Sequence, residues 1–308
     1  MIKTDFLPHT PSRQRLIQWA TYTAVVVATV LVVSKAFAWY VTDSLSIQAS
    51  LVDSLLDTCA SIINFIALRH ALKPPDAEHR FGHGKAEALA SLAQSIFIAL
   101  SALWLMREVF YRSYHPTAIL YSTMAVIVMV ASTVLTIFLV LGQRYVIART
   151  QSLAISADSL HYQTDILTNI GVLISFGVST YFHFVYVDTF VGAVIALYIL
   201  YTSWQIVKKS FDILMDHELP KETLSTIRQL AQSHPQVLGI HDLRTRSSGH
   251  SEFIQMHLDL EASLTLDQAH HIAEEVAKKI YEVFPHAEVI IHQDPVGILR
   301  PNRRQRNP

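Results

Sequence analysis

The first two thirds of the chain consist of long apolar segments separated by short polar ones. Each apolar segment is long enough, as a helix, to cross the roughly 30 Å hydrocarbon core of a bilayer. The first is too long for the apolar core of a cleaved signal peptide, and others follow it, so we expect it to remain. The six predicted membrane helices lie at about 15–41, 44–72, 86–111, 118–142, 152–181 and 187–209.

The last third of the chain has a different pattern. Leu224, Ile227 and Leu230 recur at the spacing of an amphipathic helix, and polar and apolar residues alternate along 253–260 as in a half-buried strand. The order helix-strand-strand-helix-strand predicts a small α+β domain with helices on one face of a sheet. The expected elements are a helix at 222–233, strands at 237–246 and 253–260, a helix at 266–284 and a strand at 287–292.

We therefore predict an α-helical membrane domain at 1–210, a small cytoplasmic α+β domain at 211–296 and a basic, disordered tail at 297–308. The composition agrees, because 51% hydrophobic and 16% charged residues are too apolar for an ordinary soluble protein. The formal net charge of -1 gives no sign of a nucleic-acid partner. The single cysteine, Cys59, excludes an internal disulfide and a zinc cage of thiolates.

Basic residues are concentrated in the polar segments that share one side of the predicted membrane domain. By the positive-inside rule, this asymmetry places both termini in the cytoplasm. The other side carries mainly Arg107 and Arg112. The residues expected on the cytoplasmic side are Lys3, Arg13, Arg15, Arg69, Lys73, Arg80, Lys85, Arg144, Arg149, Lys208 and Lys209.

Ionisable residues interrupt the second and fifth apolar segments. Asp53 and Asp57 are four residues apart, as are His161 and Asp165, so each pair shares one face of its helix. Three carboxylates and one imidazole suit zinc, and also manganese, ferrous iron or cadmium. A single intramembrane aspartate can instead serve only helix packing. Two pairs with equal spacing favour a metal site, because ionisable groups inside a membrane usually mark ion pathways.

Two other polar residues lie within the apolar segments. Lys35 is in the first, where its stem can snorkel toward an interface, and we assign it no role. Asn64 is in the second, and we expect it to form a hydrogen bond between helices rather than to bind metal.

Two further clusters lie outside the apolar segments. The loop after the second segment carries Asp76, His79 and His83, which can bind metal or remain ordinary solvated side chains. In the last third, His292 and Asp294 are two residues apart and share one face of a strand. We expect His271 to point away from its neighbour His270, and surface positions for His217, His234, His250 and His286.

With these features the chain resembles the cation diffusion facilitator family, and most closely its bacterial zinc and ferrous-iron efflux type. The resemblance covers about 15–296, with no departure at a family ligand position. The motifs that carry it are LVDSLLD at 51–57, FGHGKAE at 81–87, LHYQTD at 160–165, HDLRTR at 241–246 and VIIHQDP at 289–295.

The resemblance implies three metal sites and a homodimer that pairs through metallochaperone-like cytoplasmic domains. It also implies an ion pair between Lys85 and Asp216 near the membrane surface. The transport site would be Asp53, Asp57, His161 and Asp165; the loop site Asp76, His79 and His83; and the binuclear cytoplasmic site His241, His257 and Asp294 for one ion, with His270, His292 and the bridging Asp294 for the other.

The implied activity is export of zinc, with cadmium, ferrous iron, manganese or cobalt as further cargo, in exchange for protons across the bacterial inner membrane. The chain would be a secondary transporter and not an enzyme. It has no phosphate-binding loop of the form G-x-x-x-x-G-K-[ST], so direct use of ATP is unsupported.

Two other classes of protein stay open, a membrane enzyme with a metal site and a metal sensor or store. A membrane metalloprotease needs His-Glu-x-x-His, and a CDP-alcohol phosphotransferase carries Asp-Gly-x-x-Ala-Arg before its aspartate pair; the chain has neither. A metal sensor or store, anchored by its membrane part, stays open. The four intramembrane ionisable residues argue against a simple anchor.

Overall fold

The computed structural model describes residues 11–42, 45–114, 123–182, 187–249, 251–285 and 287–296. The described chain forms two compact units, one ending at Leu214 and the other starting at Met215. Each unit has a hydrophobic core of its own. The predicted tail at 297–308 lies outside the described residues.

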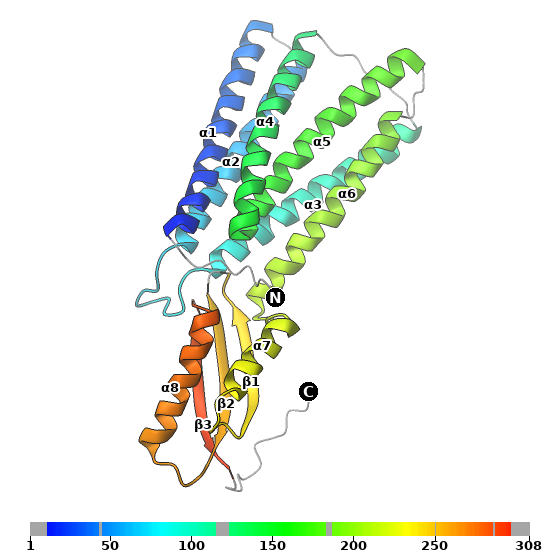
Figure 1. Ribbon diagram of the computed structural model, residues 1–308. Helices are drawn as coiled ribbons and strands as arrows, with labels where there is room; N and C mark the ends of the chain where they lie inside the picture. The colour runs from blue at the N-terminus through cyan, green and yellow to red at the C-terminus, as the bar shows by residue number, and fades with distance from the viewer. Residues whose placement is uncertain are drawn as a thin grey trace. The chain divides into compact units, whose positions relative to one another are not determined.

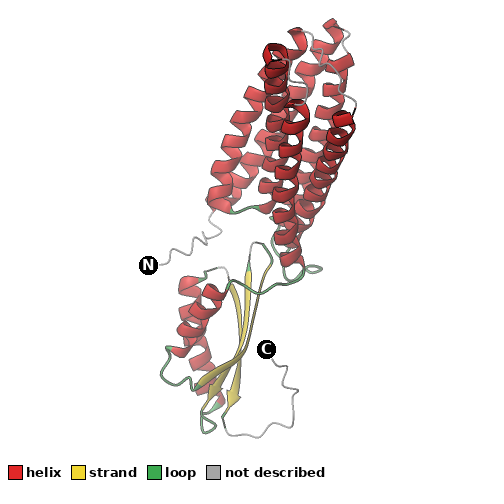
Figure 2. Cartoon of the chain, turned by 90° about the vertical axis from the view of Figure 1, so that its right-hand side faces the viewer, coloured by secondary structure: helices red, strands yellow, loops and turns green. Residues whose placement is uncertain are grey.

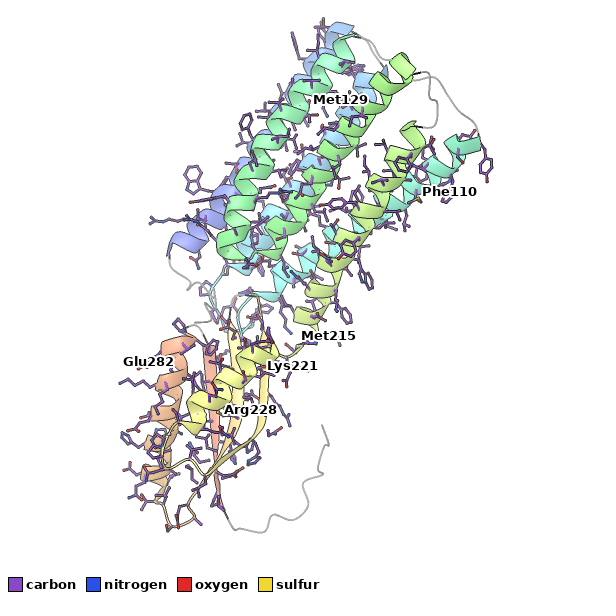
Figure 3. The ribbon with its side chains drawn as sticks, turned by 45° about the vertical axis from the view of Figure 1, so that its right-hand side comes forward. Phe110, Met129, Met215, Lys221, Arg228 and Glu282 are labelled. Carbon is purple, nitrogen blue, oxygen red and sulfur yellow. The ribbon has the colours of Figure 1, made fainter. Side chains whose placement is uncertain are left out.

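Long helices build the first unit (Figure 1). Among the residues that the structure describes, a span long and apolar enough to cross a membrane is found in α1, α3, α4 and α6. Large apolar side chains cover the outer surface of these helices, as for Phe110, which is 64% exposed (Figure 3). Such a surface is suited to lipid rather than water. The helices are α1 (Pro11–Thr42), α2 (Leu45–Ala71), α3 (Lys85–Tyr114), α4 (Thr123–Thr150), α5 (Leu153–Phe182) and α6 (Val187–Leu214).

The helices α2 and α5 are about as long as the others. They carry the two predicted ligand pairs. The structure thus supports a helical membrane domain. It remains a prediction that all six helices cross the bilayer.

Small residues allow the helices to approach closely. Ala154 and Ala157 at the start of α5 are fully buried. Gly171 lies where α5 meets α6, and a Cβ atom there would lie 2.7 Å from Cδ1 of Ile195. Close packing over small residues is the usual way in which membrane helices associate.

The predicted end of the fourth membrane helix was wrong. We expected it near 142, with Arg144 and Arg149 beyond it, but α4 continues to Thr150. Both cations have contacts: Nη2 of Arg144 donates to Oε1 of Gln163 at 2.8 Å, and the Arg149 guanidinium lies 4.4 Å from the Tyr145 ring centroid. The helix ends where the next residue adopts a left-handed backbone with φ of 51°.

The second unit has the predicted order of elements. Its sheet has the order β1-β2-β3, with β1 antiparallel and β3 parallel to β2. The two helices pack on one face of the sheet (Figure 2), where Met256 and Leu258 meet Ile227, Val276 and Ile280. The elements are α7 (Lys221–Gln232), β1 (Gly239–Ser247), β2 (Glu252–Leu260), α8 (Leu266–Val283) and β3 (Ala287–Pro295).

The opposite face of the sheet carries a row of histidines. His241, His257 and His292 occupy paired positions on β1, β2 and β3. Because side chains alternate along a strand, these residues point away from the core that Met256 and Leu258 form. Directly after His241 the register of β1 shifts, and Asp242 adopts a φ of 47°.

Candidate metal centres

Three groups of carboxylates and imidazoles come together in the described part of the chain. Within each group the potential ligand atoms all lie within 4.8 Å of one another. This spacing is compatible with shared coordination of one divalent cation. The groups are Asp57, His161 and Asp165; Asp76, His79 and His83; and His241, His257 and Asp294.

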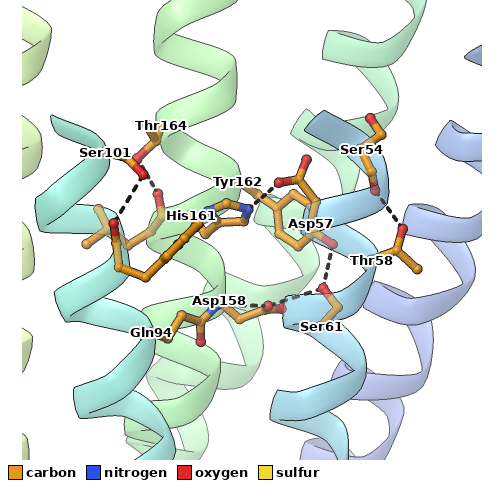
Figure 4. A network of polar contacts seen from close by, with 12 residues as sticks. Ser54, Asp57, Thr58, Ser61, Gln94, Ser101, Asp158, His161, Tyr162 and Thr164 are labelled. Atoms are coloured by element: carbon orange, nitrogen blue, oxygen red, sulfur yellow. Dashed lines mark hydrogen bonds and ion pairs between the residues drawn. The ribbon is translucent and has the colours of Figure 1, made fainter. Parts of the chain in front are cut away.

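The first group lies between α2 and α5 in the helical unit. Nε2 of His161 is 2.7 Å from Oδ1 of Asp57, and the two side chains are 12% and 16% exposed (Figure 4). Asp165 lies one turn further along α5. Asp53 lies one turn before Asp57 on α2, and its side chain is outside the described residues.

A second polar layer, centred on Asp158, lies next to this group. Its carboxylate accepts hydrogen bonds from Nε2 of Gln143 at 2.7 Å, Nε2 of Gln94 at 3.4 Å and Oγ of Ser61 at 3.5 Å. The Tyr162 hydroxyl is 2.8 Å from Oγ of Ser61. Asp158 was not among the residues predicted from the sequence. Its position three residues before His161, on the same side of the helix, was the available signal.

Further polar contacts hold the start of α5. Nδ2 of Asn64 on α2 donates to the Ala154 carbonyl at 3.2 Å, which confirms the expected bond between helices. Oε1 of Glu87 on α3 accepts from Oγ of Ser152 at 2.6 Å and from the Ala154 amide at 3.2 Å. Glu87 thus satisfies one of the amide groups that a helix start leaves unpaired.

Lys35, to which we assigned no role, is bonded to the neighbouring helix. Its Nζ donates to Oγ of Ser54 at 2.6 Å and to the Ser50 carbonyl at 3.3 Å. The neighbouring helix α2 thus offers acceptors to the ammonium group.

The loop group is organised by Asp76. Its Oδ1 accepts from the amides of Glu78 at 3.0 Å and His79 at 2.7 Å, and the His79 bond is the main cause that lowers the pKa of the Asp76 carboxyl. Nε2 of the buried His83 lies 3.2 Å from Oδ2 of Asp76. The ring of His70, from the end of α2, packs against that of His83 at 4.7 Å between centroids.

The third group surrounds the buried carboxylate of Asp294. Its Oδ2 lies 2.8 Å from Nδ1 of His257 and 3.1 Å from Nε2 of His241, and its Oδ1 lies 3.1 Å from Nε2 of His292. Asp242 and Asp259 lie at the margin, at 3.9 Å from His257 and 3.3 Å from His241. A buried carboxylate beside imidazoles fits a divalent cation, which His241, His257 and Asp294 can bind together.

His270 does not join this group within one chain. It lies on α8, which packs on the other face of the sheet, and its described partner is Glu274 at 3.3 Å. His271 faces a different acid, Glu275, at 3.2 Å, as expected for a side chain pointing elsewhere.

Among the predicted surface histidines, His217 is exposed but His234 is not. His234 is buried with Nε2 2.8 Å from Oε2 of Glu275, because α7 and α8 close over it. His250 and His286 lie outside the described residues.

The predicted pair Lys85–Asp216 has one member in each unit. Nζ of Lys85 donates to the Leu214 carbonyl at 3.4 Å, and Oδ1 of Asp216 accepts from Nη1 of Arg246 at 3.2 Å. The pairing of the two residues therefore stays a prediction.

Apolar helices with acid and imidazole groups between them, together with an α+β domain that gathers further such groups, are features of a membrane protein that handles metal cations. Two family models cover most of the chain. Residues 21–215 match the cation efflux transmembrane domain, and residues 219–296 match the cation efflux protein cytoplasmic domain. The chain belongs to the cation efflux family, the cation diffusion facilitators, as its sequence motifs predict.

Two similar proteins align with nearly the whole length of the chain, and a solved structure aligns with part of it. Protein p34 of Rickettsia prowazekii is 45% identical, over 93% of this chain and 95% of that protein. The cation-efflux pump FieF of Shigella boydii serotype 18 is 44% identical, over 92% and 95%. A solved structure of CzrB in its zinc form is 30% identical over 28% of this chain and 99% of its own, with a TM-score of 0.26.

Proposed function

We propose that this protein exports zinc from the cytoplasm in exchange for protons, as a homodimer in the bacterial inner membrane with both termini cytoplasmic. Cadmium and ferrous iron are further cargo. The 2.7 Å contact between Asp57 and His161 carries the proposal, because it joins two helices through groups that bind metal or protons. Asp165 and Asp53 complete a set of three carboxylates and one imidazole, which suits zinc.

The exchange follows from competition for the same lone pairs. A metal ion binds deprotonated carboxylates and a neutral imidazole, so its arrival releases protons. Protons that enter from the other side then favour release of the ion. The proton gradient drives export when these two steps face opposite sides of the membrane.

The cytoplasmic group regulates this cycle in our proposal. One ion is held by His241, His257 and Asp294 on one chain. A second ion shares Asp294 and His292, and its His270 comes from the other copy, since α8 lies on the far side of the sheet in its own chain. Metal at this group then stabilises the dimer, and the pair Lys85–Asp216 stabilises it further. The loop site binds an additional metal ion at the cytoplasmic surface.

Zinc flux into sealed proteoliposomes tests the proposal. The purified chain is expected to carry zinc against an imposed proton gradient, and zinc entry is expected to be matched by proton movement in the opposite direction. Asp57→Asn should stop both, and Glu261→Gln, at an exposed turn in the α+β unit, serves as the control. Absence of flux by the parent chain would favour a membrane-anchored metal sensor or store.

A further inference from the structure

The polar layer around Asp158 runs parallel to the layer of metal-capable residues. Asp57 and Ser61 are one turn apart on α2, and His161 and Asp158 are nearly one turn apart on α5. Both steps lead from the metal-capable layer toward the C-terminal end of α2 and the N-terminal end of α5. The same two helices therefore meet in two adjacent layers (Figure 4), first through Asp57–His161 and then through Ser61–Asp158.

The Asp158 carboxylate is held by neutral donors from three other helices. Gln143 of α4 donates to Oδ2, whereas Gln94 of α3 and Ser61 of α2 donate to Oδ1. No basic side chain contacts Asp158 within the described part of the chain. The residue is only 2% exposed, so these hydrogen bonds must replace water. A single acceptor that joins four helices restricts how far each can shift.

We propose that Asp158 is a positioning residue for metal binding: it holds α5 at the distance from α2 at which His161 and Asp57 can share an ion. The inference rests on the proposed function and adds a residue that contributes no ligand. Groups that orient metal ligands from behind typically change metal affinity by about 10–100-fold when they are removed. Asp158 acts one step further away, through the helix backbone.

Unpaired oxygen atoms in this layer make it possible to distinguish a positioning role of Asp158 from a role of its negative charge. The Oε1 atoms of Gln143 and Gln94 are buried and lack a hydrogen-bond partner in the described structure. If the side chain of Gln143 turns over, its Oε1 can accept from an asparagine amide at position 158. Asp158→Asn can thus keep the link between α4 and α5 without the charge, whereas Asp158→Leu leaves the donors of Gln143, Gln94 and Ser61 without an acceptor.

The first measurement is zinc binding to the full-length chain by calorimetry. The part of the isotherm that Asp57→Asn removes reports the site between α2 and α5. We expect Asp158→Leu to weaken this part by about tenfold. Asp158→Asn should restore most of the affinity. Ser61→Ala removes only the α2 donor and should weaken the same part, whereas Ser95→Ala, at a buried hydroxyl without a described partner, should not.

The second measurement is zinc flux in proteoliposomes over a range of zinc concentrations. The expected signature of Asp158→Leu is a higher half-saturating concentration with a maximal rate that falls less. If Asp158→Leu does not fold, Ser61→Ala gives the same test.

Binding and flux curves for Ser61→Ala and Asp158→Leu that match the parent would overturn the inference. Loss of all flux in a folded Asp158→Asn with normal zinc binding would show that the charge itself acts, and would also overturn it. The binding measurement tests the role of Asp158 even if the parent chain does not transport zinc. Absence of transport by the parent would reject only the proposed export.

Discussion

The imidazole of His161 on α5 lies 2.7 Å from the carboxylate of Asp57 on α2, although the two residues are 104 positions apart in the chain. The contact joins two helices that each carry ionisable groups through an otherwise apolar bundle. Each of these groups costs free energy when it is placed in hydrocarbon, so their convergence indicates a functional site.

Loss of either carboxylate next to His161 should abolish transport. We expect Asp57→Asn and Asp165→Ala to reduce zinc flux in proteoliposomes to the background of empty vesicles, because too few ligands remain for the ion. Both variants should still form the dimer, which size-exclusion chromatography checks. Flux near that of the parent in either variant would remove the site from the mechanism.

Replacement of the imidazole should change which metal is preferred. His161→Asp makes all four ligands hard carboxylates, so the ratio of zinc to manganese flux should fall. The control is His217→Asp at an exposed position, for which the ratio should stay that of the parent. An unchanged ratio in His161→Asp would mean that His161 does not select the ion.

Removal of the cytoplasmic cluster should impair regulation but leave transport possible. In a chain with His257→Ala and Asp294→Asn, we expect zinc flux to persist with a higher half-maximal concentration or a lower maximal rate. Zinc should also protect amides of β2 and β3 from hydrogen exchange in the parent and no longer do so in this variant, since a bound ion stabilises only the folded state. Complete loss of flux would place this cluster on the transport path.

The His234–Glu275 contact should make the stability of the α+β unit depend on pH. The hydrogen bond from His234 lowers the pKa of Glu275 from its ordinary value of 4.5. A lowered carboxyl pKa stabilises the fold above the unfolded value, and this contribution is lost as the pH falls through the folded value. Glu275→Gln should therefore lower the melting temperature at neutral pH and have less effect at acid pH. Glu282→Gln, on the exposed surface of α8, should do neither.

A methyl group at Gly171 should disturb the packing of α5 on α6. Alanine usually stabilises a helix relative to glycine by about 1 kcal/mol, so Gly142→Ala, with open space around it, should be neutral or stabilising. At Gly171 the new Cβ would clash with Cδ1 of Ile195, and the melting temperature in detergent should fall. Adding Ile195→Val, which shortens that side chain, should recover part of the loss. Equal effects of the two alanines would contradict a close contact here.

The sequence predicted best what depends on local spacing. Asp57, His161 and Asp165 could be identified because each pair repeats at helical distance within an apolar segment, and His292 and Asp294 because two residues on a strand share a face. The alternation at 253–260 likewise predicted which face of the sheet carries His257. Each of these inferences uses only a period and the chemistry of the side chain.

The sequence could not predict what depends on a neighbouring element. His234 has the same local surroundings as a surface histidine, and only the packing of α7 on α8 buries it. The acceptor Ser54 of Lys35 lies on α2, and the acceptor Gln163 of Arg144 lies on α5, so neither contact can be read from local spacing. The importance of Asp158 follows only from its hydrogen bonds to Gln143, Gln94 and Ser61, which lie on other helices.

The row of His241, His257 and His292 also affects how the sheet can assemble. Strand β3 pairs with its neighbour along backbone groups that are nearly the same at every residue, so a shift by one residue costs few backbone bonds. Such a shift would turn Ile291 outward and move His292 and Asp294 to the core side at the same time. An ion bound there as proposed would then lose its ligands, so metal would favour the correctly aligned sheet.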